Sequence, residues 1–276
     1  MNPALSATLA LQGDRCRAMA VERATTADLA AAQLKKSFRA NTPVLENLSF
    51  EILPGEAVGL IGANGAGKST LLRCCVGLTP IDGGTVRLLG VELSTSGGRE
   101  LRRLRSKVGF VFQQHNLVPR LSVLTNVLHG SLSRAGARSW FQTLAPRLER
   151  EQAMHYLDLV GLADLAGRRA DRLSGGQSQR VAIARALMQE PRIIIADEPV
   201  ASLDPKAAEE VMDRFARLLE TVGLTFVFTS HNLQHALTYA DRLLGLRHGV
   251  LTLDGPSKAQ NLSTLRELYD DPPKQP

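Results

Sequence analysis

The sequence feature that most constrains this chain is a glycine-rich octapeptide, Gly62 to Ser69, which reads Gly-Ala-Asn-Gly-Ala-Gly-Lys-Ser. It matches the phosphate-binding pattern G-x-x-x-x-G-K-[ST]. The apolar run 57–61 before it predicts a buried strand, and the pattern of 70–76 after it predicts a helix. In this order, glycines let successive backbone N–H groups converge on an anion, and the helix N-terminus adds its dipole. The octapeptide therefore predicts a nucleotide-phosphate site within an α/β fold.

The side chains of the octapeptide have separate predicted roles. Lys68 is expected to pair with the β- and γ-phosphates, and the Ser69 hydroxyl is expected to bind Mg²⁺. The remaining nucleotide contacts are assigned to Gly62, Ala63, Asn64, Gly65, Ala66, Gly67 and Thr70. Because GTPases, kinases, helicases and transporter motors all use such a loop, it does not by itself fix the function.

Apolar runs recur along the chain and predict further strands. They span 108–112, 193–196 and 224–228, and helical patterns separate them. This alternation predicts a parallel sheet covered by helices. Shorter alternating segments between 29 and 50 predict additional β-structure before the octapeptide.

Helical patterns dominate the middle of the chain, from about 98 to 190, and predict an inserted helical lobe. A further helix is predicted after Asp204 and Pro205, because Asp caps a helix and Pro suits its first turn. The apolar face of that helix is predicted to contain Val211, Met212, Phe215, Leu218 and Leu219.

The chain of 276 residues, 44% of them hydrophobic, is long enough for one large domain or two lobes. Residues 1–27 lack apolar periodicity and are predicted to be a flexible extension, 28–255 the folded domain and 256–276 a C-terminal tail. No export leader is evident, and the apolar runs are far shorter than the roughly 20 residues of a membrane-spanning helix. We therefore expect the chain to stay in the cytoplasm.

The net charge and the cysteine content limit which kinds of ligand and partner are expected. The net charge of +6 is compatible with a nucleotide, a nucleic acid or an anionic membrane face. The arginines between 99 and 172 are dispersed, which favours a solvated basic face over a nucleic-acid tract. Cys16, Cys74 and Cys75 form no CxxC pair and have no nearby His at metal-ligand spacing, so we interpret them as reduced thiols.

Two further motifs carry chemistry. Asp197 and Glu198 follow the predicted strand 193–196 and are expected at the carboxyl edge of the sheet, where ligands of open α/β sheets bind. There Asp197 is predicted to hold Mg²⁺ through water, and Glu198 to polarise the attacking water as general base. The segment 173–177 reads Leu-Ser-Gly-Gly-Gln and precedes the helical pattern 179–188, which predicts a second anion-binding helix terminus with a hydroxyl donor.

Together these motifs resemble the signature of ABC-family ATPases. The resemblance implies a P-loop NTPase of the ABC ATPase type, α/β with a mostly parallel core sheet, an N-terminal antiparallel β-subdomain and an inserted helical lobe. It also implies ATP and Mg²⁺ as ligands and a head-to-tail homodimer that sandwiches two ATP molecules. In such a dimer Ser174 and Gly176 touch the γ-phosphate that the partner subunit's Lys68 binds, and Gly175 and Gln177 belong to the same contact.

Four further positions take roles from this resemblance. Gln113 is similar to the glutamine that reaches Mg²⁺ and the attacking water. His231 resembles the switch histidine that contacts the γ-phosphate and orients the water with Glu198. Asp204 closes a loop that resembles the segment crossing the dimer interface and contacting the nucleotide. Phe38 stands where the family places an aromatic ring on adenine, with a buried core phenylalanine as the alternative.

Three classes of ABC protein compete for this sequence: a transporter motor, a DNA-repair or chromosome-maintenance ATPase, and a translation factor. The repair class inserts a long coiled coil and the translation class has two ATPase halves, and this chain has neither. We therefore predict a transporter motor with no nucleic-acid partner. A free-standing motor must dock on separate permease subunits, which favours a bacterial importer at the cytoplasmic face of the inner membrane, with a periplasmic substrate-binding protein as an indirect partner.

The stretch 109–130 closely resembles the same region of phosphonate-importer ATPases, within a resemblance that covers roughly residues 28–252. Phosphite or hypophosphite importers use closely similar motors, and polar amino-acid importers are the more distant alternative. The region 113–140 is expected to receive a short cytoplasmic helix from each permease. Its apolar surface is predicted to consist of Val118, Leu121, Val123 and Leu124, unless these residues only cover the core of the lobe.

Overall fold

The computed structural model describes residues 26–39, 42–266 and 268–269, with residue 218 described by its backbone alone. The described chain divides into two compact units. Residues 106–224 form the first unit, and the described residues of 22–105 and 225–276 form the second. The first unit is therefore an insertion in the sequence of the second. The extension predicted for 1–27 lies almost wholly outside the described residues and stays a prediction.

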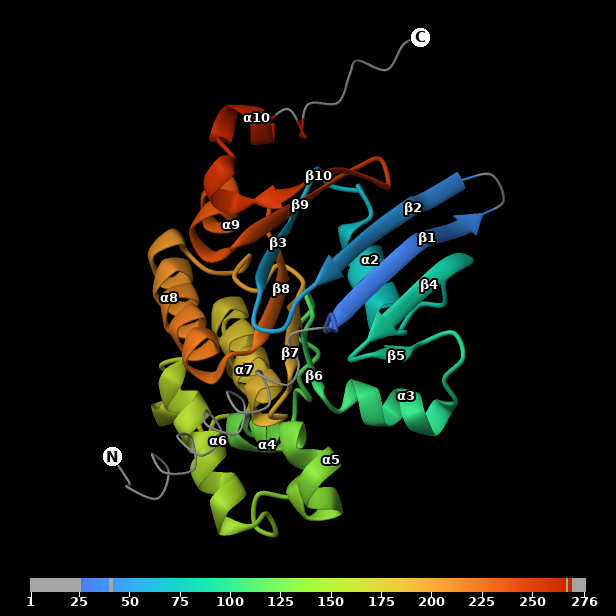
Figure 1. Ribbon diagram of the computed structural model, residues 1–276. Coiled ribbons are helices and arrows are strands. Elements are labelled where there is room, and N and C mark those ends of the chain that lie inside the picture. The colour runs from blue at the N-terminus through green and yellow to red at the C-terminus, as the bar shows by residue number, and fades with distance from the viewer. Residues whose placement is uncertain (1–25, 40–41, 267, 270–276) are drawn as a thin grey trace. The chain divides into compact units, whose positions relative to one another are not determined.

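An antiparallel sheet of four strands, in the order β2-β1-β4-β5, belongs to the second unit (Figure 1). Its strands are β1 (Leu29–Arg39), β2 (Thr42–Ile52), β4 (Gly83–Leu88) and β5 (Val91–Glu92). Leu34 of β1 and Leu48 of β2 are fully buried, as the alternating pattern between 29 and 50 requires. Helix α2 (Lys68–Cys75) packs against β2 and β4, and α3 (Gly98–Arg105) follows β5. This confirms the predicted antiparallel β-subdomain.

Parallel strands form the rest of the second unit. β3 (Ala57–Ile61) pairs in parallel with β8 (Thr225–Thr229) and with β9 (Arg242–Arg247), while β10 (Val250–Pro256) runs antiparallel to β9. Helix α9 (Leu233–Tyr239) packs on β3, and α10 (Leu262–Arg266), after the 3-10 turn η5 (Ser257–Ala259), packs on α9. The stretch predicted as a C-terminal tail from 256 onward thus contains η5 and α10.

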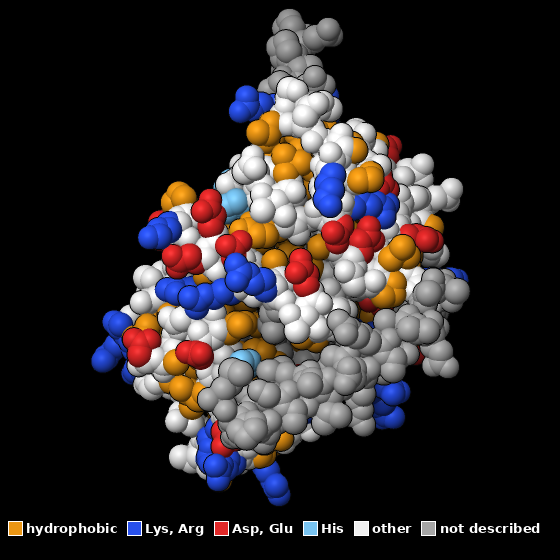
Figure 2. Space-filling view, turned by 60° about the vertical axis from the view of Figure 1, so that its left-hand side comes forward, with side chains coloured by type: hydrophobic (Ala, Val, Ile, Leu, Met, Phe, Trp, Pro, Cys, Tyr) orange, Lys and Arg blue, Asp and Glu red, His pale blue; other side chains and the backbone are white. Residues whose placement is uncertain are grey.

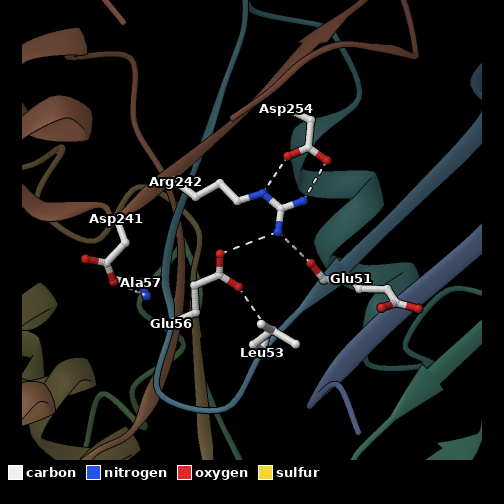
Figure 3. A network of polar contacts seen from close by, with 7 residues as sticks. All are labelled: Glu51, Leu53, Glu56, Ala57, Asp241, Arg242 and Asp254. Carbon is white, nitrogen blue, oxygen red and sulfur yellow. Dashed lines mark hydrogen bonds and ion pairs between the residues drawn. The ribbon is translucent and has the colours of Figure 1, made fainter. Parts of the chain in front are cut away.

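A polar network fixes the start of β3, the end opposite the glycine-rich loop. Arg242 donates to both carboxylate oxygens of Asp254 at 2.5 and 2.6 Å and to the backbone oxygen of Glu51 at 3.0 Å (Figure 3). The carboxylate of Glu56 lies 3.4 Å from the same guanidinium and accepts the backbone N–H of Leu53 at 2.9 Å. Bidentate, charge-assisted bonds of this kind are geometrically specific. The network therefore fixes the turn from which β3 enters the sheet.

The first unit is mainly helical. Its two strands, β6 (Val108–Val111) and β7 (Ile193–Ala196), pair in parallel. Its helices are α4 (Val123–Leu128), α5 (Leu132–Ala135), α6 (Arg147–Leu159), α7 (Gly175–Met188) and α8 (Pro205–Val222), and its 3-10 turns are η1 (His129–Ser131), η2 (Gly136–Trp140), η3 (Ala163–Leu165) and η4 (Ala170–Arg172). Helices α4 and α6 pack against α7, which also packs against β6 (Figure 1). The predicted lobe limits of about 98 and 190 stay a prediction.

The start of α8 confirms the capping prediction. Asp204 is the N-cap, its carboxylate accepts the N–H of Ala207 at 3.1 Å, and Pro205 occupies the first turn. The predicted apolar residues Val211, Met212, Phe215 and Leu219 are buried, and the side chain of Leu218 lies outside the described part of the chain. The observed elements therefore confirm the predicted α/β class, with mostly parallel strands around β3 and β7.

The surface agrees with the dispersed charges of the sequence. On the face shown in Figure 2, the Lys and Arg side chains of the described residues are interspersed with Asp and Glu. Among the described helices, none is both long and apolar enough to span a bilayer.

Candidate functional site

The glycine-rich loop joins β3 to α2, as predicted. Its last glycine, Gly67, has φ 103° and precedes Lys68, the first residue of α2. Gly62 has φ 146°, and a Cβ there would overlap the carbonyl oxygen of Leu246. A side chain is therefore excluded at the start of the loop both by backbone conformation and by space. Ser69 and Thr70 follow in the first turn of α2 and are half-buried.

Lys68 is folded back over its own loop. Its ammonium group donates to the carbonyl oxygen of Gly62 at 2.6 Å and to that of Ala63 at 3.0 Å, and the residue is 7% exposed. Burying an ammonium group is costly unless hydrogen bonds satisfy it. The loop carbonyls of Gly62 and Ala63 meet that need, and the next two residues of the loop, Asn64 and Gly65, are exposed.

His231 lies at the same sheet edge as the loop. Because β3 and β8 run in parallel with Leu60 opposite Thr229, the segments that follow both strands emerge at one edge. His231 itself is exposed, and a turn holds it in which the Ser230 hydroxyl accepts the N–H of Asn232 at 3.0 Å. The structure thus places His231 in the unit that contains the loop, at the edge where the loop begins.

Phe38 is the one predicted nucleotide contact for which the sequence left a packing alternative. Its ring is 64% exposed, and the Lys36 ammonium lies 5.4 Å from the ring centroid. This exposure excludes the alternative of a buried core phenylalanine. An exposed ring with a nearby cation remains available for stacking on a base.

The first unit brings together Gln113 and Glu198. In the parallel pair of β6 and β7, Val111 lies opposite Ala196, so the residues after both strands share one edge. There the Gln113 amide donates to the Glu198 carboxylate at 3.3 Å. Asp197 is buried at 4% exposure, and its backbone N–H donates to the carbonyl of Val111 at 2.8 Å. The predicted acidic pair therefore lies at the carboxyl end of its strand, beside Gln113.

Glu198 carries backbone strain. Its φ is 53°, in the left-handed region that non-glycine residues rarely adopt. Such conformations cost on the order of 1–3 kcal/mol and concentrate at functional sites. Six other non-glycine residues of the described chain also have positive φ, so the strain supports a functional role for Glu198 only together with its acidic side chain and its contact with Gln113.

Sequence reasoning missed Gln179, which holds this strained segment. Its side chain is fully buried, its amide N–H donates to the Glu198 carbonyl at 2.6 Å, and its amide oxygen accepts the N–H of Ser202 at 3.0 Å. Gln179 thus ties α7 to the backbone of residue 198 and to the loop that ends at Asp204. The available signal was a glutamine just ahead of the apolar positions 181–184 of a predicted helix.

The start of α7 is built by Ser174 and Gln177. The Ser174 hydroxyl accepts the backbone N–H of Gln177 at 3.2 Å, and the Gln177 side chain accepts that of Ser174 at 3.0 Å. This reciprocal arrangement is a capping box. At Gly176 a Cβ would lie 2.6 Å from the Leu203 side chain, so the loop ending at Asp204 lies directly against α7. Ser174, Gly175, Gly176, Gln177 and Asp204 thus belong to one region of the first unit.

Oxygen ligands suited to Mg²⁺ are present among the predicted metal residues. Ser69 offers a hydroxyl, Gln113 an amide oxygen and Asp197 a carboxylate. Among the described residues, no group of three or more His, Cys, Asp and Glu side chains could hold a metal ion. Mg²⁺ commonly uses only one or two carboxylates and completes its shell with water and substrate phosphates. Each of the predicted residues therefore has a donor atom of the kind that this ion prefers.

Cys74 and Cys75 lie buried in α2, and both are free thiols. Burial raises the pKa of Cys74 to about 11 and raises the pKa of Cys75 further. Both groups therefore stay protonated at neutral pH. This confirms the interpretation of these two cysteines as reduced thiols, while Cys16 lies outside the described residues.

The predicted docking surface is partly wrong. Val123 and Leu124 are buried, at 0% and 6% exposure, because they form part of the lobe core. Val118 is exposed, and Leu121 is half-buried. The exposed apolar side chains of this unit include four that the prediction lacked: Trp140, Phe141, Leu144 and Leu148.

The chain is similar to known proteins of the family that its motifs indicate. A family model described as ABC transporter matches residues 45–201. The chain is 44% identical over 239 residues to the phosphonates import ATP-binding protein PhnC 2 of Oceanobacillus iheyensis, covering 86% of this chain and 93% of that protein. It is 49% identical to PhnC 1 of Pseudomonas aeruginosa, covering 86% of each, and 48% identical to a phosphate-import ATP-binding protein PhnC of Mycolicibacterium smegmatis, covering 83% and 87%.

A solved structure with a similar fold is the dimeric ATP-binding cassette MJ0796 in a post-hydrolysis state bound to ADP and Pi. The TM-score is 0.75 at 32% sequence identity, and the match covers 83% of this chain and 98% of that cassette.

Proposed function

The chain belongs to the ABC transporter family, and we propose that it is the ATP-hydrolysing motor subunit of a bacterial importer for phosphonates. The observation that carries this proposal is the phosphate loop of the second unit, whose own carbonyls hold the buried Lys68. Within the first unit, the acidic residue Glu198 adds support, because its carboxylate is hydrogen-bonded to Gln113. Relatives named as phosphonates import ATP-binding proteins support the cargo.

Nucleotide binding begins at the loop. The ammonium group of Lys68 exchanges the Gly62 and Ala63 carbonyls for the β- and γ-phosphates of ATP, and the backbone from Gly62 to Thr70 surrounds them. The exposed ring of Phe38 stacks on adenine. Ser69, Gln113 and Asp197 would supply oxygen ligands to Mg²⁺, and the ion would neutralise charge on the phosphate oxygens.

Hydrolysis uses the residues around Glu198. Its carboxylate accepts a proton from the attacking water, Gln113 orients the water, and His231 contacts the γ-phosphate. Gln179 holds the Glu198 backbone in its strained conformation through a bond of 2.6 Å. The base thus approaches the water from a fixed direction, which supplies the positioning on which phosphoryl transfer depends.

A second copy of this chain completes each site. The Ser174 hydroxyl uses its oxygen to cap α7, and its own hydrogen can still be donated to a phosphate. Gly175, Gly176, Gln177 and Asp204 accompany it at the interface of a head-to-tail homodimer. ATP then bridges the partner subunit's Lys68 to the start of α7, so binding closes the dimer and hydrolysis opens it. The MJ0796 cassette, which is dimeric and binds ADP and Pi, supports a homodimer.

Permease subunits are the second class of partner. The motor acts from the cytoplasmic face of the inner membrane through separate integral subunits. The exposed side chains of Val118, Trp140, Phe141, Leu144 and Leu148 offer apolar area to a docking helix. A periplasmic substrate-binding protein delivers cargo to the permease and contacts this chain only indirectly. The proposed partners include no nucleic acid.

Inorganic phosphate is a further candidate for the cargo. The name of the Mycolicibacterium smegmatis relative specifies phosphate import, so inorganic phosphate joins phosphite and hypophosphite as an alternative substrate. Polar amino acids are the more distant possibility.

Uptake by cells tests the proposal. A strain that lacks this gene should lose uptake of labelled methylphosphonate, and the native gene should restore it while a Glu198→Gln copy should not. Uptake of methylphosphonate should exceed that of phosphate and phosphite. Restoration of phosphate, phosphite or amino-acid uptake without methylphosphonate uptake would refute the proposal that phosphonates are the cargo. Full activity of the Glu198→Gln copy would refute the proposal that this chain is the ATP-hydrolysing motor.

A further inference from the structure

The C-terminal segment of the described chain returns to the glycine-rich loop. The phenolic oxygen of Tyr269 accepts the backbone N–H of Gly62 at 3.2 Å. The same hydroxyl donates to the carbonyl of Ser230 at 3.4 Å. Gly62 is the first residue of the loop, and Ser230 directly precedes His231. One hydroxyl therefore links the start of the phosphate loop to the turn that carries the switch histidine.

Tyr269 reaches this position because the preceding residues are packed in place. Leu265 of α10 is fully buried, and a Cβ at Gly245 would lie 2.9 Å from the side chain of Leu268, so Leu268 packs directly on the β9 backbone. The backbone N–H of Tyr269 donates to the carbonyl of Arg266 at 2.9 Å and closes a turn after α10. The contact with Gly62 is thus part of a built structure.

Gly62 is held from two sides. Its N–H donates to Tyr269, and its carbonyl accepts from Lys68 at 2.6 Å. When phosphate binds, Lys68 leaves that carbonyl, whereas the bond from Tyr269 does not depend on the ammonium group. Since Gly62 is buried, loss of the tyrosine hydroxyl would leave its N–H without this acceptor in a place with little water.

We propose that Tyr269 is a positioning residue of the nucleotide site, which fixes the first residue of the loop and couples it to the backbone before His231. The inference rests on the proposed ATPase function. The bond to Ser230 is long for an O–H···O contact, so Tyr269 acts mainly on the loop and to a smaller extent on His231. Its loss therefore changes nucleotide affinity more than the rate of the chemical step.

The test removes only the hydroxyl. Tyr269→Phe keeps the ring, and Tyr156→Phe is the matched control, because Tyr156 is a buried tyrosine of α6 whose hydroxyl bonds to Gln152. We expect Tyr269→Phe to raise KM for ATP and Kd for ADP about threefold to tenfold, the loss typical of one hydrogen bond, and to lower kcat by less than about threefold. The control should leave these constants unchanged.

Backbone hydrogen exchange distinguishes a local loss of the bond to Gly62 from a general loss of stability. In Tyr269→Phe, the peptide containing Gly62 should exchange faster, while peptides from α6 and α7 keep their native rates. Kinetic constants within twofold of native, or the same changes in both variants, would overturn the role of Tyr269. If Tyr269→Phe does not fold, hydrogen exchange of the native chain is the test. A Gly62 amide that is unprotected from exchange in the absence of nucleotide would also overturn the role of Tyr269.

Lys68→Ala separates this inference from the proposed function. Nucleotide binding by Lys68→Ala at native affinity would refute the function itself. Loss of binding in Lys68→Ala together with native behaviour of Tyr269→Phe would refute only the inference about Tyr269.

Discussion

Two helices of this chain begin at glycine-containing motifs, and they begin differently. At the start of α2, Gly67 adopts a left-handed conformation and no side chain caps the helix. At the start of α7, Ser174 and Gln177 form a complete capping box. An uncapped helix start leaves its backbone N–H donors for a ligand, whereas a capping box satisfies two of the donors at a helix start within the chain. The comparison indicates that the α2 start is open to an anion and that the α7 start is preformed, which agrees with our proposal that the α7 start meets an anion held by another subunit.

The largest effect is expected where the anion is held. Lys68→Ala should weaken ATP binding about 100-fold or more, because charged hydrogen bonds to two phosphates are lost. Titration with a fluorescent nucleotide measures this. Lys258→Ala, which removes an exposed lysine of the same unit, is the control. Equal losses in the two variants would mean that net charge, and not the loop, binds ATP.

Removing the base should separate binding from chemistry. Glu198→Gln should lower kcat for ATP about 10²–10⁴-fold, since general-base catalysis is lost, while the affinity for ATP stays within a few-fold of native. In the presence of ATP, the Glu198→Gln variant should then accumulate as a dimer, which size-exclusion chromatography detects. Turnover at the native rate would remove Glu198 from the mechanism, and a variant that stays monomeric with ATP would break the link between nucleotide and closure.

The two duties proposed for Ser174 can be separated. Ser174→Asp keeps a good capping oxygen, so the free energy of unfolding should change by less than about 0.5 kcal/mol. The added negative charge should repel the γ-phosphate and lower ATPase activity at least about tenfold. Ser174→Ala is the complement, because it should cost about 1 kcal/mol as well as activity. An active Ser174→Asp chain would show that Ser174 only caps α7.

The smallest effect is expected at the buried Cys74 thiol of α2. Burial raises the pKa of the Cys74 thiol to about 11, so between about pH 9 and 11 the native chain keeps a proton that the unfolded chain loses. Stability should therefore fall as pH rises through this window. Chemical denaturation from pH 8 to 11 measures the slope, which should become shallower in Cys74→Ala. An unchanged slope would mean that Cys74 does not titrate differently in the two states.

Local signals predicted much of the fold. The strand β3 was predicted with its observed limits of 57 and 61, since an apolar run bounded by a turn and a glycine loop leaves little choice. Asp204 and Pro205 gave the start of α8 for the same reason. In the candidate site, the loop around Lys68 and the acidic pair after β7 were placed by short motifs in a strand context.

The remainder depends on contacts between residues far apart in the chain. Gln179 bonds to a carbonyl 19 residues away, and Tyr269 bonds to an N–H 207 residues away, so no local pattern identifies either partner. Val123 and Leu124 were placed on the surface because periodicity shows which side of a helix is apolar but not what covers it. Glu198 was found as an acid, but its strained backbone was not.

The insertion of residues 106–224 between the two parts of the second unit also affects the order of folding during synthesis. β3 pairs with β8 and β9, as in the register of Val58 with Val227 and Arg242. At about 5–20 residues per second, the ribosome needs roughly 10–30 s between making β3 and making β8. During that interval β3 lacks its partners β8 and β9, whereas β6 and β7, which pair with each other, both lie within the inserted unit. For seconds, the nascent chain therefore exposes an unpaired apolar strand that is prone to aggregate. We expect its dependence on chaperones to be determined by β3 more than by the helical unit.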